Sequence, residues 1–203
     1  MTRRTRPIRG WTIGLATMAV AIGMSVRPMR SLIEQSMVMH MAVQMPMLVL
    51  GGWLLMYAAA RSRFALQMGR WNRYGLTGFM ASQVILAYWM LPLAIDKALV
   101  QPEADFFKLL SLLACGALLA HSMQRAPLVL QLFFVGYMVS MMTWLGLYFA
   151  TTDLRLCNAY SLATQTATGW VLLTLGLGLG AAWLARTIFL RKRVGWKGLL
   201  VDF

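Results

Sequence analysis

Charged side chains are scarce in this sequence, and acidic ones are the scarcest. Only 12% of the 203 residues are charged, and just six of them are Asp or Glu. A soluble domain carries charge on roughly a quarter of its residues. Here 60% of the residues are hydrophobic instead. Water is therefore not the solvent around most of this chain, and the composition predicts an integral membrane protein.

Residues that commonly carry catalysis are also few. Two cysteines, Cys115 and Cys157, show neither a Cys-x-x-Cys pair nor the spacing of a zinc finger. There is no Ser-His-Asp arrangement, no phosphate-binding loop and no pair of carboxylates deep within an apolar segment. These absences argue against a hydrolase or a proton pump, and we expect that the protein is not an enzyme.

Basic residues, in contrast, are abundant. Nineteen Lys and Arg give a formal net charge of +13. Binding to nucleic acid would require these charges on one folded face. They lie instead in clusters between apolar runs, which is the pattern that membrane insertion leaves. The expected partner is therefore the lipid bilayer and not nucleic acid.

Six segments are apolar and close to the length of about 20 residues that a membrane-spanning helix needs. They cover about residues 11–26, 36–60, 76–95, 106–120, 128–150 and 170–190. The prediction is one all-α domain, residues 1–203, built as a bundle of six transmembrane helices. No internal repeat is evident, which argues against a transporter made of inverted repeats.

The first of these segments has two interpretations. Its basic start followed by an apolar run is also typical of a signal peptide. No small-x-small cleavage site follows, because the run ends in Met24-Ser-Val-Arg-Pro28. We therefore expect an uncleaved first helix, and cleavage would leave five helices in the same orientation.

The distribution of charge predicts the orientation of the bundle. With the N-terminus in the cytoplasm, fourteen of the nineteen basic residues fall on the cytoplasmic side. Five of the six acidic residues fall on the outer side, and only Asp202 lies inside. Positive residues accumulate in cytoplasmic loops. Both termini are therefore predicted to be cytoplasmic, in a multi-pass protein of a bacterial inner membrane.

The most distinctive pattern lies near the outer end of the second predicted helix. Met37, His40, Met41 and Gln44 are spaced so that they share one helical face. Thioether sulfur and imidazole nitrogen are suitable ligands for Cu(I), so His40, Met37 and Met41 form a candidate metal site. A purely structural role for these residues stays open, because methionine is also a common apolar filler in helix packing.

Pro46 and Gly51-Gly52 follow on the same helix. Proline removes a backbone hydrogen bond, so we expect a kink just below His40. The two glycines allow a neighbouring helix to approach closely. In the sixth helix, Gly176 and Gly180 form a Gly-x-x-x-Gly step that predicts another tight packing face.

A polar cluster is predicted at the outer side, near this site. Asp105 and Lys108 are three residues apart and can pair on one helix face. Asp105 also suits the N-terminus of the fourth helix, where a carboxylate caps free N–H groups, and we favour that structural role. The candidate members of the cluster are Glu34, Gln44, Asp96, Asp105 and Lys108.

Three stretches, in matching order between about residues 31 and 123, resemble the CtaG family. The first is Met-Val-Met-His40-Met, followed by Gln44-Met-Pro46-x-Leu48-x-x-Gly51. The second is Trp89-Met-Leu-Pro92-x-x-x-Asp96-x-Ala-Leu99-x-x-Pro102, and the third runs from Phe107 to Gly116. CtaG proteins are membrane factors for the assembly of cytochrome c oxidase and are associated with copper delivery to it. The resemblance implies such a role here.

The sequence departs from the family where that family tends to carry further histidines. Ser36 stands one turn before His40, and Asp105, Lys108 and Leu109 stand at the start of the following polar helix. The resemblance therefore implies a relative whose metal site is altered.

Three functions follow as hypotheses. The first is an assembly or copper-handling factor for a haem–copper cytochrome oxidase, with an outer-facing Cu(I) site at His40 and oxidase subunits as partners. The second is a non-catalytic structural subunit of another, larger membrane complex. The third, a small transporter, is the weakest, because few charges are embedded in the membrane and no repeat is evident.

Overall fold

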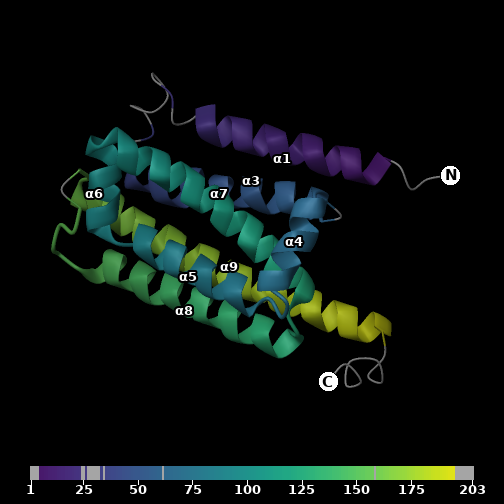
Figure 1. The fold of residues 1–203 in the computed structure, drawn as a ribbon. Coiled ribbons are helices and arrows are strands. Elements are labelled where there is room, and N and C mark those ends of the chain that lie inside the picture. The colour runs from purple at the N-terminus through teal and green to yellow at the C-terminus, as the bar shows by residue number, and fades with distance from the viewer. Residues whose placement is uncertain are drawn as a thin grey trace.

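The chain folds into helices joined by short connections, as the computed structural model in Figure 1 shows. The structure describes residues 5–23, 26, 33, 35–60, 62–157 and 159–194, and this part of the chain contains no β-strand. The predicted all-α fold is thus confirmed. The elements are α1 (Thr5–Gly23), η1 (Met39–Gln44), α3 (Met45–Ala58), α4 (Arg63–Trp71), α5 (Leu76–Trp89), α6 (Pro92–Val100), α7 (Pro102–Arg125), α8 (Leu128–Thr151) and α9 (Leu162–Val194).

Each of the six predicted apolar segments is helical over most of the residues that the structure describes. In the part of the chain that the structure describes, four helices are long and apolar enough to cross a membrane, and the number is five if a bent pair of helices forms one span. The four spans are Met39–Ala58, Pro102–Arg125, Leu128–Thr151 and Leu162–Phe189. Within α1, Thr12–Gly23 is a shorter apolar stretch. These helices are compatible with a multi-pass membrane protein, while six full spans remain a prediction.

The bent pair corrects the third predicted helix, residues 76–95. This segment is two helices, α5 and α6, whose axes differ by 73°. Pro92 has no backbone N–H and restricts the residue before it to extended conformations. Leu91 accordingly has φ −76° and ψ 127°, which ends the helical path before α6 begins.

Helix α4 was not predicted, because it lies between the apolar segments 36–60 and 76–95. The Ser62 hydroxyl accepts a hydrogen bond from the Ala65 N–H at 3.2 Å and so caps the start of α4. The end of α4 is fixed by Asn72, whose side-chain amide donates to His121 Nδ1 at 3.0 Å and to Ser122 Oγ at 2.9 Å. His121 Nε2, 3.2 Å from the Ala65 carbonyl, completes this link between α4 and α7.

Glycines determine how closely α3 can pack. A methyl group at Gly51 would press on Met18 of α1, and one at Gly52 would overlap the Leu113 carbonyl of α7. From the other side, Gly116 of α7 lies against the Val49 carbonyl of α3. The close approach predicted for Gly51-Gly52 is confirmed, and α3 lies in backbone contact with both α1 and α7.

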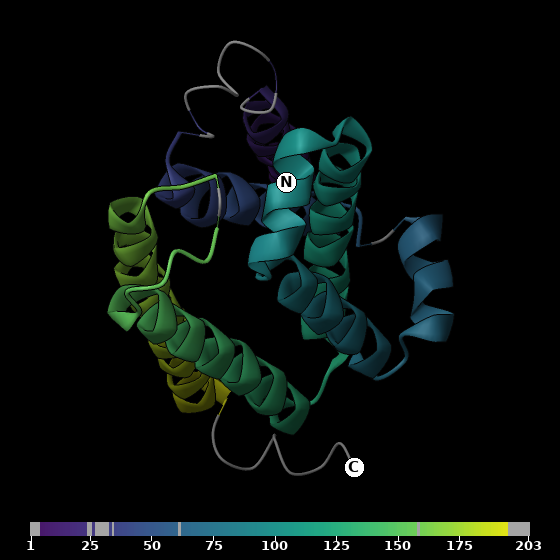
Figure 2. The same ribbon diagram turned by 90° about the vertical axis from the view of Figure 1, so that its left-hand side faces the viewer.

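Helices α8 and α9 form a second closely packed pair, set beside the other helices in Figure 2. Gly146 and Gly169 touch across this pair, and the predicted face of Gly176 and Gly180 packs on Met142 and Val139 of α8. The pair joins the rest of the bundle near its ends. At one end the Phe79 and Phe134 rings stack with centroids 4.9 Å apart.

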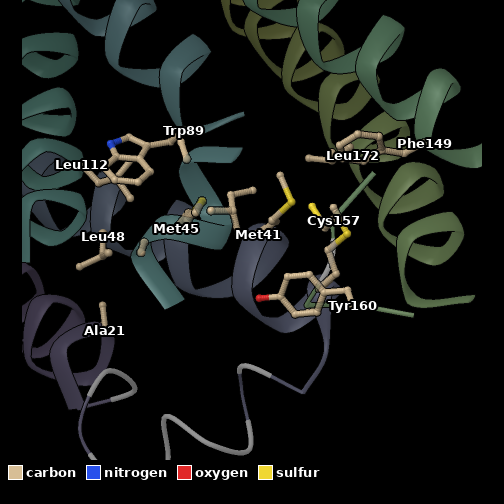
Figure 3. Close-up of a cluster of buried hydrophobic side chains, with 14 residues drawn as sticks. Ala21, Met41, Met45, Leu48, Trp89, Leu112, Phe149, Cys157, Tyr160 and Leu172 are labelled. Carbon is tan, nitrogen blue, oxygen red and sulfur yellow. The ribbon is translucent and has the colours of Figure 1, made fainter. Parts of the chain in front are cut away.

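An apolar cavity of about 270 Å³ lies between the α8–α9 pair and the other helices. Its wall includes six methionines: Met41, Met45, Met90, Met138, Met141 and Met142. The main core, drawn in Figure 3, consists of buried side chains from α1, η1, α3, α5, α6, α7, α8 and α9 and from the connections next to η1 and α9. Methionine adapts its shape to irregular spaces, so this abundance fits a loosely filled interface between two helical groups.

The glycine contact between α3 and α7 gives a first prediction. Gly116→Ala should destabilise the fold by about 1–3 kcal/mol, because its methyl group would force the α3 backbone away. The matched control is Gly136→Ala in α8, where an added Cβ meets nothing within 4 Å. Thermal unfolding in detergent should show a lower Tm for the first variant and an unchanged or higher Tm for the second. Equal Tm values would contradict the packing described for α3 and α7.

Candidate functional site

The site begins with an irregularity in the helix that carries His40. Residues Met39–Gln44 form the π-helix η1, and the Met45 N–H bonds the carbonyl of His40, five residues earlier. Pro46 lies just beyond this turn and cannot sit in a regular α-helix without a lost hydrogen bond and a clash with the carbonyl four residues before it. The distortion predicted near Pro46 therefore takes the form of a widened turn. Such turns are frequent at functional sites.

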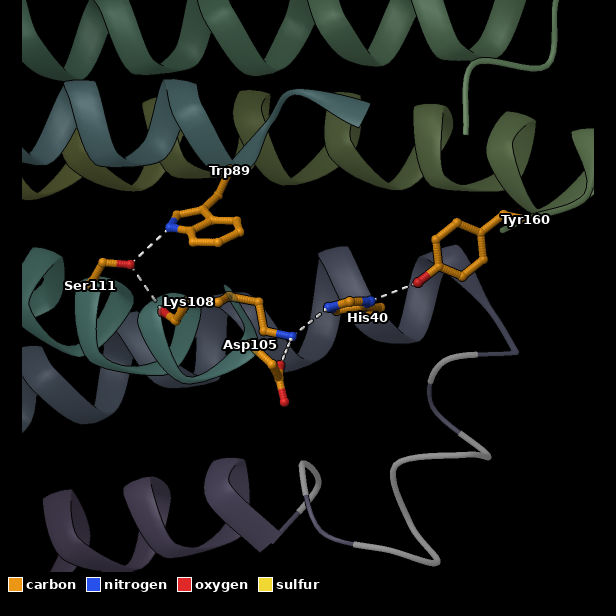
Figure 4. Close-up of polar contacts among 6 residues, drawn as sticks. All are labelled: His40, Trp89, Asp105, Lys108, Ser111 and Tyr160. Atoms are coloured by element: carbon orange, nitrogen blue, oxygen red, sulfur yellow. Dashed lines mark hydrogen bonds and ion pairs between the residues drawn. The ribbon is translucent and has the colours of Figure 1, made fainter. Parts of the chain in front are cut away.

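The π-turn holds His40 in the interior, with none of its surface exposed. Both of its ring nitrogens are engaged, as Figure 4 shows. Nδ1 lies 2.6 Å from the Tyr160 hydroxyl, in the segment that leads into α9. Nε2 lies 3.0 Å from Lys108 Nζ, on α7. His40 therefore faces the interior of the bundle.

Lys108 is a charged side chain in that same interior. Only 1% of its surface is exposed, and its Nζ is 2.7 Å from Asp105 Oδ1. This is the pair three residues apart that the sequence predicted. The capping role favoured for Asp105 is wrong, because α7 starts at Pro102 with Gln101 as its cap residue. Asp105 lies inside the first turn, where its charge neutralises Lys108.

Tyr160, His40, Lys108 and Asp105 form a series of linked side chains, called here the His40 chain. The donor of each hydrogen bond in it follows from the chemistry of the groups. A lysine ammonium only donates, so His40 Nε2 must accept from Lys108. The imidazole, neutral beside an ammonium, then carries its proton on Nδ1 and donates it to the Tyr160 oxygen. The one lone pair of the ring is therefore used by Lys108.

Neighbouring contacts fix both ends of this chain. The Trp89 indole N–H donates to Ser111 Oγ at 2.8 Å, and that hydroxyl donates to the Lys108 carbonyl at 3.2 Å. At the other end Arg155 Nε donates to the Tyr160 carbonyl at 2.7 Å. Gln165 also binds the backbone of the α8–α9 connection, through Leu154 and Leu156. The His40 chain is thus anchored to α5, α7 and the start of α9.

The predicted site residues can now be placed. Met37, Met41 and Gln44 are buried with 0%, 4% and 3% of their surfaces exposed, on the face that they share with His40. Asp105 and Lys108 join His40 directly. Asp96 of α6 lies near Cys157. Glu34, the remaining predicted member, lies outside the described residues.

The residue that sequence reasoning missed is Tyr160. Only 2% of its surface is exposed, and its hydroxyl is the hydrogen-bond partner of His40 Nδ1. Its sequence position offered one signal. The predicted topology places the loop of residues 151–169 on the outer side, the same side as His40, and a tyrosine there combines an apolar ring with a hydroxyl that needs a partner.

The donor types fit copper in part. Among the residues that the structure describes, no group of three or more His, Cys, Asp or Glu could hold a metal ion. Binding at His40 would therefore depend on the thioethers of Met37 and Met41, which are soft donors suited to Cu(I). It would also require Lys108 to leave His40 Nε2, because the ring has no second lone pair.

The bond between Tyr160 and His40 gives a second prediction. Tyr160→Phe removes the acceptor of the Nδ1–H and leaves this buried donor without its partner, which should lower stability by about 1–3 kcal/mol. The control is Tyr137→Phe in α8, whose side chain is 48% exposed. Tm values in detergent should fall for the first variant and stay level for the second. Equal effects would mean that the hydroxyl of Tyr160 contributes nothing specific.

Cys157 gives a third prediction, on pH dependence. It lies in the connection between α8 and α9, where burial first and the charge of Asp96 second raise the pKa of its thiol to about 11. The thiolate is the reactive form, so alkylation should be very slow at pH 7 and accelerate only as the pH approaches 11.

Alkylation rates in a Cys115→Ser background would measure this, since Cys157 is then the sole thiol. Asp96→Asn should lower the pKa and speed the reaction at a given pH. Asp153→Asn, an exposed acidic residue in the same connection, should leave the rate unchanged. Rapid alkylation of the parent protein at pH 7 would contradict the raised pKa.

Comparison with known proteins found no matching family model, no matching curated protein and no matching solved structure. The resemblance to the CtaG family therefore rests on the three stretches quoted from the sequence. Function has to be inferred from those residues and from the geometry around His40.

Proposed function

We propose that this chain is a bacterial inner-membrane factor that handles copper during the assembly of a haem–copper cytochrome oxidase. The observation that supports it best is a convergence in space. The three CtaG-like stretches contribute His40, Trp89 and Ser111, which Lys108 connects in one buried hydrogen-bonded network (Figure 4). Residues that were separate motifs in the sequence thus belong to one site.

In this proposal, copper is a cargo that the protein takes up and passes on. His40 supplies the imidazole nitrogen, and Met37 and Met41 supply the thioethers. Tyr160 orients the ring by accepting from Nδ1, as an outer hydrogen-bond partner does for a ligating histidine. Neutral, soft donors in a buried setting favour Cu(I) over harder cations.

The position of the site also agrees with a role at the outer face of the membrane. In Figure 1, α1 begins and α9 ends at one end of the bundle, while α6 and the α8–α9 connection lie at the other. If both termini are cytoplasmic, as the distribution of basic residues predicts, His40 and Tyr160 lie toward the outer side. Cargo would then be exchanged on that side with oxidase subunits.

A second candidate, a non-catalytic structural subunit of a larger membrane complex, is favoured by a different observation. Only 6% of the apolar window of α8 and 11% of that of α9 are buried, compared with 50% for α7. A helix pair this exposed offers a broad apolar face to the helices of a partner. In this case the His40 chain would serve only to lock the bundle together.

Copper content after purification in mild detergent tests the first proposal. The wild-type protein loaded with Cu(I) should retain copper, and His40→Gln should lose most of it. The control is His121→Gln, which changes the other histidine of the chain. It should retain wild-type copper, because His121 belongs to the separate network with Asn72 and Ala65. Glutamine keeps a donor and an acceptor at both positions, which limits damage to the fold.

The same preparation separates the two candidates. Copper lost equally from both variants, or never bound at all, would overturn copper handling at His40. A copper-free chain that purifies in a stable complex with other membrane proteins would favour the structural subunit instead.

A further inference from the structure

Lys108 presents the clearest chemical conflict in the molecule. A neutral imidazole has one lone pair, and a metal bound at Nε2 would need it. In the structure this lone pair accepts a hydrogen bond from the Lys108 ammonium at 3.0 Å. An ammonium group and a Cu(I) ion both carry one positive charge, and they compete for one atom.

The Lys108 ammonium is held in this position by a second contact, with Asp105. Lys108 Nζ is 2.7 Å from Asp105 Oδ1, and only 1% of the lysine side chain is exposed. A buried charge is tolerated when it is paired and hydrogen-bonded, and Asp105 and His40 together meet both conditions. The Lys108 backbone is fixed as well, because its carbonyl accepts from Ser111 Oγ at 3.2 Å.

We infer that Lys108 is a built-in competitor for the metal position on His40, so that copper binds only as the ammonium withdraws from Nε2. This inference rests on the proposed function. The lysine stem has four flexible carbons, which allows Nζ to swing aside while it stays near Asp105. No proton or electron is transferred: Nε2 gives up one hydrogen bond and gains one coordination bond, and Nδ1–H continues to donate to Tyr160.

Such competition suits a protein that must release its cargo. A buried nitrogen left without a partner is costly, and this cost would oppose the departure of a bound ion. Here Lys108 returns to Nε2 as the ion leaves, so release creates no unsatisfied group. The competitor therefore weakens binding and eases release together.

Cu(I) affinity, measured in competition with a chromophoric Cu(I) chelator on the full chain in detergent, tests this inference. Lys108→Leu removes the competitor without adding a ligand, and should bind Cu(I) about tenfold or more tightly, since a hydrogen bond from a charged group no longer has to be broken. Lys108→Arg keeps a cation that donates, and should stay near the wild-type affinity. His40→Gln combined with Lys108→Leu should lose the site.

Because Lys108→Leu leaves Asp105 buried without its cation, the double variant Asp105→Asn with Lys108→Leu provides a neutral version of the same test. It should also bind more tightly than wild type. If wild type binds copper through His40 but neither Lys108→Leu protein binds more tightly, the competitor role is wrong while copper handling stands. If no variant binds copper at all, copper handling itself fails, and the competitor role fails with it.

Discussion

The buried ammonium of Lys108 is the constraint to which the geometry of the site is tied. A charge with 1% of its side chain exposed cannot rely on water, so the fold has to supply its partners. Asp105, on the same helix, neutralises it, and His40, on η1, accepts a hydrogen bond from it. Because His40 then has its proton on Nδ1, Tyr160 is drawn in as the acceptor. One charge thus connects α7, η1 and the segment leading to α9.

Packing elsewhere in the bundle brings these groups within reach. Gly52 and Gly116 allow α3 and α7 to touch through their backbones, so the helix that carries η1 lies directly against the helix that carries Lys108. The π-turn before Pro46 widens the helix at His40. The α8–α9 pair touches the other helices sparsely and borders an apolar cavity. The bond between Tyr160 and His40 is accordingly one of few polar ties between the two helical groups in the described part of the chain.

The local features of this fold were largely predictable from sequence, whereas the contacts between distant segments were not. Apolar runs gave the positions of the helices, because the length of a span is set by bilayer thickness. The spacing of Met37, His40, Met41 and Gln44 predicted a shared face, and all four are buried. Helix α4 was missed because its nine residues are too few to span a membrane and include two Arg and one Gln, and it depends on the link between Asn72 and His121. Tyr160 was missed since it lies 120 residues from its partner, and a pairing at that distance leaves no mark in local periodicity.

The copper site proposed at His40 has to accommodate the charge of Lys108. The resemblance to the CtaG family places this lysine in a stretch where that family tends to carry histidines. A cation in place of a ligand repels a bound metal, unless the cation withdraws from the metal position. The ammonium brings one positive charge, as Cu(I) does, and lies between His40 Nε2 and the carboxylate of Asp105. In the proposed copper-bound state the lysine stays near Asp105, so the ion adds one positive charge to the site. When the ion leaves, Lys108 returns to Nε2, and its pairing with Asp105 leaves no uncompensated charge behind.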